Sequence, residues 1–262
     1  MTTSLEIGVA GVGVFMSDYP TAADWHAGRR SVEPQLPVGA QLDRRSRARS
    51  SVLTKALADA FFEAAGSQGI DPGEGAAVFG SALGEVGTML GLLNQILRDH
   101  EEPSPMAFAL SVHNAASGVV SIATKNRGFT SSLGADHDTP AMALLEAIGL
   151  IAERAEPVIV ACGDEPTPVA LVPEEEAWEL AAMAIALVPL GSDDDAARVR
   201  IRGPFKASPT LVGPDMAPRI ARNPQVGLLD LISAIQTGRS GTVALDRGRG
   251  QGWCMEVLCP DG

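Results

Sequence analysis

The sequence predicts an α/β fold in which a mixed central sheet lies between helices. Segments with the composition of strands alternate with segments of helical periodicity from residue 5 to about residue 166. Crossover helices of this kind join parallel strands, so the sheet is expected to be largely parallel there. Of the 262 residues, 45% are hydrophobic, 4% are aromatic and 28 are glycine, which suits closely packed layers with small side chains between them.

The first half contains four predicted strands and four predicted helices. The opening run Leu5 to Phe15 is rich in β-branched and small residues and predicts a buried strand. Apolar residues then recur at helical spacing from Ser50 to Ala65. The alternation continues with a strand at 76–81, helices at 83–97 and 113–124, a strand at 130–133, a helix at 139–153 and a strand at 157–162.

The pattern changes after Pro166, where strands predominate. Short strands are predicted at 183–190, 198–202, 242–245 and 253–258. The one clear helix, 225–237, follows a capping Asn223 and has Pro224 at its first turn. We expect one domain over residues 1–262, with a shortened second half at 167–262.

The formal net charge of −12 makes nucleic acid an unfavourable partner. Basic residues are scattered apart from one run, Arg44 to Arg49, which is either a docking patch for an acidic protein or a solvated helix start. The apolar run 180–190 is too short to span a bilayer, and the first residues lack the pattern of a signal peptide, so no membrane partner is expected.

Three cysteines, Cys162, Cys254 and Cys259, show no metal-ligand spacing. Their odd number argues against a disulfide framework and favours the cytoplasm. Neither a metal nor a cofactor is expected, because the four histidines have no suitably spaced neighbours beyond Asp136-His137-Asp138. The glycine-dense segment 247–252 precedes a strand, without the helix N-terminus that would hold a phosphate, so we predict a hairpin turn.

The segment Ser104 to Glu165 resembles the part of a β-ketoacyl synthase that runs from a Ser-Pro turn to the nucleophile strand and its helix. Leu42-Asp43-Arg44, Gly80-Ser81 and Ile7 to Gly11 match the same family in the same order, and the ending 247–258 resembles its glycine-rich last hairpin. The resemblance implies a thiolase-like (ketosynthase) fold, matched well over residues 5–166 and truncated in its second half.

The resemblance also shows what the chain lacks. The family's nucleophilic cysteine falls at Asp136 to Asp138 of this sequence, where His137 is the closest match. The family's two catalytic histidines belong to its second half, but no histidine follows His137 here. Decarboxylative condensation uses all three groups, so the resemblance implies a catalytically inactive subunit.

The shorter members of the family are ketosynthase-like proteins of polyene-forming and aryl-polyene synthases. The resemblance therefore implies a chain-length factor of a type II polyketide synthase. Such a subunit forms a heterodimer with a catalytic ketosynthase, meets an acyl carrier protein through that complex, and accommodates the growing acyl or polyene chain. The interface is expected at His113, Asn114, Thr130, Ser131, Ser132 and Leu133.

The predicted helix 83–97 resembles the one that lines the product tunnel in chain-length factors. Its apolar residues recur at helical spacing, and core packing explains that pattern equally well. The expected tunnel residues are Leu83, Val86, Met89, Leu90 and Leu93.

Two other functions remain open. One is an acyl thioesterase or acyltransferase that uses His137 with Asp136 or Asp138 as a base for water. The other is a scaffold that binds acyl carrier protein through Arg44 to Arg49.

Overall fold

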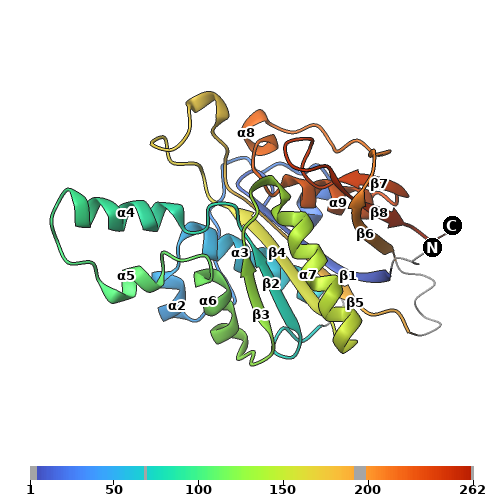
Figure 1. Ribbon diagram of the computed structural model, residues 1–262, viewed down its shortest axis with the longest axis horizontal. Helices are drawn as coiled ribbons and strands as arrows, with labels where there is room; N and C mark the ends of the chain where they lie inside the picture. Colours follow the sequence, from blue (N-terminus) through green and yellow to red (C-terminus); the bar gives the residue numbers. More distant parts are fainter. Residues whose placement is uncertain (1–4, 68–69, 192–198, 261–262) are drawn as a thin grey trace.

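A single mixed sheet runs through the computed structural model, which describes residues 5–67, 70–191 and 199–260. The sheet has eight strands in the order β3-β2-β4-β5-β1-β6-β8-β7 (Figure 1). The strands are β1 (Glu6–Met16), β2 (Ala76–Gly80), β3 (Thr130–Leu133), β4 (Val158–Asp164), β5 (Ala181–Val188), β6 (Arg200–Lys206), β7 (Gly241–Ala244) and β8 (Trp253–Leu258).

Helices cover both faces of the sheet, which confirms the predicted α/β class. The helices are α1 (Ala22–His26), α2 (Arg44–Arg49), α3 (Val52–Gly66), α4 (Val86–Leu97), α5 (Pro105–Ala109), α6 (Ala115–Thr124), α7 (Thr139–Arg154), α8 (Pro218–Ala221) and α9 (Val226–Gln236). Two short 3-10 turns are η1 (Asp136–Asp138) and η2 (Glu174–Glu176). One core lies between the sheet and α7 with α9, and the other lies between the sheet and α3 with α6.

The prediction of a largely parallel sheet is wrong in extent. Among the strand-to-strand pairings of the described residues, the parallel ones are those of β2, with β3 on one side and β4 on the other. The pairings of β4 with β5, β5 with β1, β1 with β6, β6 with β8 and β8 with β7 are antiparallel. Periodicity identifies strands but not their neighbours, and β1 pairs with β5 and β6 from the second half of the chain instead of with β2.

Small residues bring helix and sheet backbones together. A Cβ atom on Gly13 of β1 would lie 1.9 Å from the carbonyl oxygen of Ala60 in α3. Glycine is therefore required there, and α3 lies directly on the centre of the sheet. The strand β5 is buried on both faces, which explains its uninterrupted apolar sequence.

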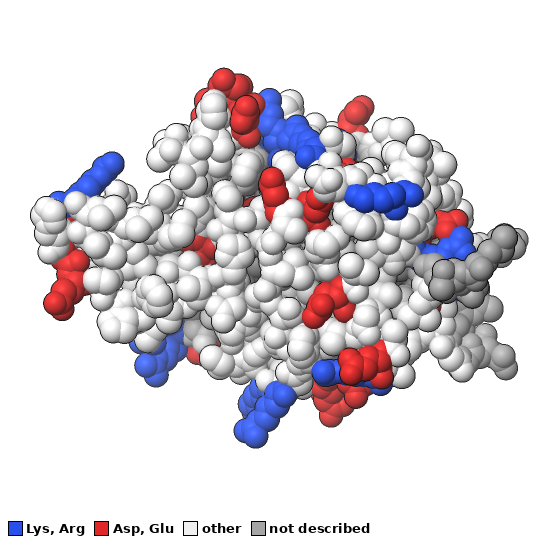
Figure 2. Space-filling model, viewed as in Figure 1, with Lys and Arg blue, Asp and Glu red and all other residues white. Residues whose placement is uncertain are grey.

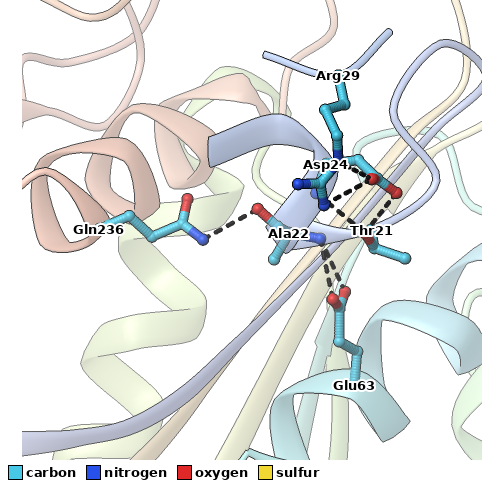
Figure 3. A network of polar contacts seen from close by, with 6 residues as sticks. All are labelled: Thr21, Ala22, Asp24, Arg29, Glu63 and Gln236. Carbon is cyan, nitrogen blue, oxygen red and sulfur yellow. Dashed lines mark hydrogen bonds and ion pairs between the residues drawn. The ribbon is translucent and has the colours of Figure 1, made fainter. Parts of the chain in front are cut away.

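A polar contact at Ala22 joins the two halves of the chain (Figure 3). The Glu63 carboxylate of α3 accepts hydrogen bonds from the backbone N–H of Ala22, at 2.9 Å, and from that of Val14, at 2.9 Å. On its other side, the carbonyl oxygen of Ala22 accepts from Nε2 of Gln236 in α9 at 3.0 Å. The indole N–H of Trp25 donates to Ser233 of α9 as well, at 2.9 Å.

Two predicted boundaries are displaced. The helix expected from Leu83 begins at Val86, because the backbone N–H groups of Ala82 and Leu83 donate to the Asp164 carboxylate and hold these residues in a turn. The strand expected at 198–202 covers Arg200–Lys206, and Arg198 lies outside the described residues. None of the helices in the described ranges is long and apolar enough to cross a membrane.

Candidate functional site

The turn η1 joins β3 to α7 and contains Asp136, His137 and Asp138. Asp136 has a left-handed backbone with a φ of 52°. The Thr139 hydroxyl accepts from the N–H of Ala135 at 2.9 Å and donates to the carbonyl of Asp136 at 2.7 Å. A strand, a tight turn and the start of a long helix would suit a nucleophilic thiolate, but the three residues of the turn carry carboxylates and an imidazole.

The cysteines lie elsewhere. Cys162 is fully buried in β4, and its burial raises the pKa of its thiol. Cys254 is buried in β8, where its Sγ donates to the carbonyl of Ala207. Burial raises the pKa of this thiol too. Both are small apolar core residues, as their sequence context predicts.

The predicted pairing of His137 with an aspartate is not formed in the described part of the chain. Neither Asp136 nor Asp138 exchanges a hydrogen bond with His137. Asp138 accepts instead from the backbone N–H of Gln251, at 2.9 Å, in the glycine-rich hairpin between β7 and β8. The hairpin itself is confirmed, and it lies against the start of α7, far away in sequence.

His137 faces a cavity of about 370 Å³ that also contacts Val172, Glu176, Trp178, Arg222 and Arg249. The sequence does not predict this cavity, because its arginines come from two distant segments, the one before α9 and the last hairpin. The two arginines within residues 247–252 are the one feature of the sequence that points to this cavity. No group of three or more His, Cys, Asp and Glu side chains in the described ranges is arranged to hold a metal ion.

Five of the six predicted interface residues come together in one open groove. His113, Asn114, Thr130, Ser131 and Ser132 line it, with a volume of about 740 Å³ between α6 and β3. The Ser132 hydroxyl donates to that of Ser117 at 2.8 Å and ties the strand to the helix. Leu133 lies in a second groove, with Phe129 and Met142, between β3 and α7.

β3 stands between these grooves at one end of the sheet. One edge of its backbone therefore faces no other described strand. Unpaired strand edges readily pair with another chain.

The predicted tunnel residues do not share one environment. Val86 is 1% exposed and belongs to the core, while Met89 and Leu93 are 39% and 42% exposed. Leu83 lies in the turn before α4, and Leu90 is half-buried. Core packing within this chain thus accounts for Val86 but leaves Met89 and Leu93 without cover.

The helix α4 projects from the body beside α5 (Figure 1), and we call the two helices the α4–α5 arm. Large apolar side chains are exposed along it, and the space-filling view shows a mainly uncharged surface at this end of the molecule (Figure 2). These side chains are Met89, Leu93, Ile96, Leu97, Met106 and Phe108. Exposed apolar patches of this kind mark interaction surfaces.

Residues 22–253 match the family model described as the N-terminal domain of beta-ketoacyl synthase. The chain belongs to this ketosynthase family. The resemblance inferred from the sequence is confirmed, as is the thiolase-like fold. No curated protein sequence matches the chain.

Solved structures of the ketosynthase fold align with the chain at low identity. One is the ketosynthase ApeO in complex with its chain length factor ApeC from Xenorhabdus doucetiae, with a TM-score of 0.68, 20% identity, and 97% of this chain and 99% of that one covered. Another is the ishigamide ketosynthase/chain length factor, with a TM-score of 0.58 and 17% identity; the alignment covers 74% of this chain and 65% of that one. A third is AntDE:AntF, a type II PKS acyl-carrier protein in complex with its ketosynthase. It aligns with a TM-score of 0.59 and 11% identity, and the alignment covers 77% of this chain and 69% of that one.

In this ketosynthase-family chain, a buried carboxylate positions the start of the α4–α5 arm. Asp164 accepts hydrogen bonds from the Ser81 hydroxyl, at 2.7 Å, and from the N–H groups of Ala82 and Leu83, both at 3.0 Å. The side-chain amide of Gln225 donates to it at 2.6 Å. Burial raises the pKa of Asp164, and these four donors oppose that shift. The network links β4, the β2–α4 turn and the start of α9.

Proposed function

We propose that the chain is a non-catalytic chain-length factor, which pairs with a catalytic ketosynthase and helps to form the tunnel that limits polyketide or polyene length. The observation that carries this proposal is the open sheet edge at β3. The residues expected at the interface line a groove beside that edge, and Leu133 lines the groove on its other side. A partner subunit would cover the unpaired backbone and both grooves at once.

The composition of η1 supports an inactive subunit. The position of the family's nucleophile holds Asp136, His137 and Asp138, and the cysteines in β4 and β8 are buried with raised thiol pKa values. Acyl transfer to an enzyme thiol requires an accessible thiolate. The condensation would therefore take place on the partner ketosynthase.

The α4–α5 arm supports a role in accommodating the acyl chain. Met89 and Leu93 are too exposed to serve the core of this chain, and both are aliphatic. Covered by a partner subunit, they would form an apolar wall suited to a reduced chain. The acyl carrier protein would meet this complex through the ketosynthase, and a cytoplasmic location stays a prediction from the cysteines.

A charged side chain in the β3 groove tests the heterodimer. Gly118 of α6 lines the groove, and a Cβ atom added to it contacts nothing within 4 Å. Gly118→Arg should therefore fold and weaken binding to a ketosynthase encoded beside this chain by at least about tenfold. Gly66→Arg at the end of α3 has the same free space and is the matched control. Equal copurification of the ketosynthase with both variants would contradict the proposed interface.

The two alternatives lack comparable support. The thioesterase hypothesis requires His137 to act as a base for water, and no carboxylate among the described residues forms a hydrogen bond that would orient its imidazole. The scaffold reading rests on α2, where Arg47 is engaged with the carbonyl groups of Ala40 and Leu42 while Arg44, Arg45 and Arg49 are exposed. Reversing those three exposed charges tests it, since loss of carrier-protein binding with unchanged product length would favour a scaffold.

A further inference from the structure

The cavity beside His137 contains two arginines that lack an acidic partner. Arg222 and Arg249 both line it, and neither forms an ion pair with any described carboxylate. Nη1 of Arg249 donates to the backbone carbonyl of Arg222 at 3.2 Å, so the two residues are adjacent. Two guanidinium groups are thus close together at one cavity.

The acidic groups nearby are engaged elsewhere. Asp230 pairs with Arg247 of the same hairpin through two hydrogen bonds of 2.6 Å, which neutralises that third arginine. Asp138 accepts from the N–H of Gln251, and Asp246 accepts from two backbone N–H groups of its own hairpin. Glu176 lines the cavity but is exposed and reaches neither arginine within ion-pair distance. Arg222 and Arg249 therefore have no ion-pair partner among the described carboxylates, although Glu176 lines the same cavity.

Trp178 and Val172 form an apolar part of the wall, and Trp178 is firmly held. Trp178 is 9% exposed, its indole N–H donates to the carbonyl of Glu165 at 3.0 Å, and its backbone N–H donates to the Thr167 hydroxyl at 3.1 Å. Val172 lies beside it. A cavity of about 370 Å³ exceeds the space that an inorganic ion fills and falls in the range of small-molecule sites, about 300–1,000 Å³.

We propose that this cavity binds an organic oxyanion, either a phosphate ester or a carboxylate. The charged head lies between the guanidinium groups of Arg222 and Arg249, which bind such oxygens through two parallel hydrogen bonds. The carbon body lies against Trp178 and Val172. The inactive turn η1 is then one wall of a binding site, with the His137 imidazole as a further hydrogen-bonding group.

The hairpin geometry gives this inference its physical basis. A Cβ atom on Gly250 would lie 2.3 Å from Oδ1 of Asp138, so the hairpin lies in close contact with the Asp138 side chain of η1. Arg249, next to Gly250, is thereby placed at the cavity. Burial and the neighbouring charges of Arg222 and Arg247 lower the pKa of Arg249, as expected for guanidinium groups held together.

Calorimetric titration of the purified full chain, without any ketosynthase, tests the inference independently of the proposed heterodimer. The probes are phenyl phosphate, benzoate and the uncharged benzyl alcohol, which share an aromatic body. We expect saturable binding of at least one anion and none of the alcohol. The tighter of the two anions identifies the head group.

Substitution of the arginines gives the decisive comparison. Arg222→Gln and Arg249→Gln should each weaken anion binding by about tenfold or more, because each removes charge-assisted hydrogen bonds to the oxyanion. Arg127→Gln, an equal change of charge in the exposed loop before β3, should leave affinity unchanged. Absence of saturable binding by both anions would overturn the inference. Equal weakening by all three substitutions would overturn it as well, since the effect would then be one of overall charge.

Discussion

Replacing Glu63 tests how firmly the two halves of the chain are joined. Its carboxylate accepts hydrogen bonds from the backbone N–H of Ala22 (Figure 3) and from that of Val14, and both residues are buried. A buried donor that loses its acceptor costs about 1–3 kcal/mol, so Glu63→Ala should lower the free energy of unfolding by about 2–6 kcal/mol. Glu63→Gln is the matched control. It keeps one carbonyl oxygen and should cost less than about 1.5 kcal/mol.

The measurement is urea unfolding followed by tryptophan fluorescence and far-UV circular dichroism. Because Ala22 also accepts from Gln236 of α9, both probes should report one transition that shifts as a unit. Two separate transitions would contradict the prediction of a single domain. A Glu63→Ala protein within about 0.5 kcal/mol of the wild type at pH 7 would refute the reasoning.

The pH dependence of the same variants has a defined sign. Burial raises the pKa of Glu63 above its ordinary value of 4.5, although the backbone donors oppose the shift. A raised pKa in the folded state means that stability present below the unfolded-state pKa is lost as the pH rises through the folded-state pKa. The Gln variant does not titrate, so its unfolding free energy should improve relative to the wild type as the pH rises above about 4.5. A difference between the two proteins that stays constant with pH would show that the pKa is unshifted.

Three further outcomes follow from the structure. In a reconstituted synthase, Met89→Trp should shorten the products and Met89→Gly should lengthen them, as measured by mass spectrometry. Val212→Trp, at a loop residue that is 82% exposed, is the control and should leave product length unchanged. Product lengths that respond to neither Met89 variant would show that the α4–α5 arm does not line the tunnel. Asp164→Asn places an amide N–H₂ group opposite a buried N–H donor, so it should lower the free energy of unfolding by about 1–3 kcal/mol. Hydrogen exchange in the turn before α4 should become faster. Unchanged exchange there would mean that other contacts hold the turn. A thiol reagent should label the half-buried Cys259 in the folded protein and reach Cys162 only after unfolding, because burial raises the pKa of Cys162; rapid labelling of Cys162 would contradict its place in β4.

Local patterns in the sequence predicted local structure well. The apolar run of β5 and the periodicity of α3 depend on which face of an element is buried, and each pattern is visible within a short stretch of chain. The start of α4 was placed three residues too early, because Asp164 captures the preceding N–H groups from a distant strand. The residues of the segment 83–97 alone give no indication of these hydrogen bonds to Asp164.

Long-range neighbours account for the rest. The segment 247–252 shows in the sequence only the strand that follows it, and on that basis it predicts a hairpin turn without a phosphate site. In the folded chain it lies against η1 at Asp138, and its Arg249 meets Arg222 from the segment before α9. The likeness to the ketosynthase family predicted the groove residues from His113 to Ser132 together, because a family alignment carries information on contacts that periodicity lacks.

The position of β1 has a consequence for the order in which the protein assembles. The first strand of the chain lies between β5 and β6, and its residues up to Met16 pair with residues from Ala181 onward. Synthesis adds about 5–20 residues per second. Both backbone edges of β1 therefore stay unpaired until β5 and β6 have been synthesised. Such late, distant pairing makes folding slow and exposes a hydrophobic strand to aggregation. Nascent chains that stop before β5 should thus be more prone to aggregation than the full chain, because both edges of β1 stay exposed in them.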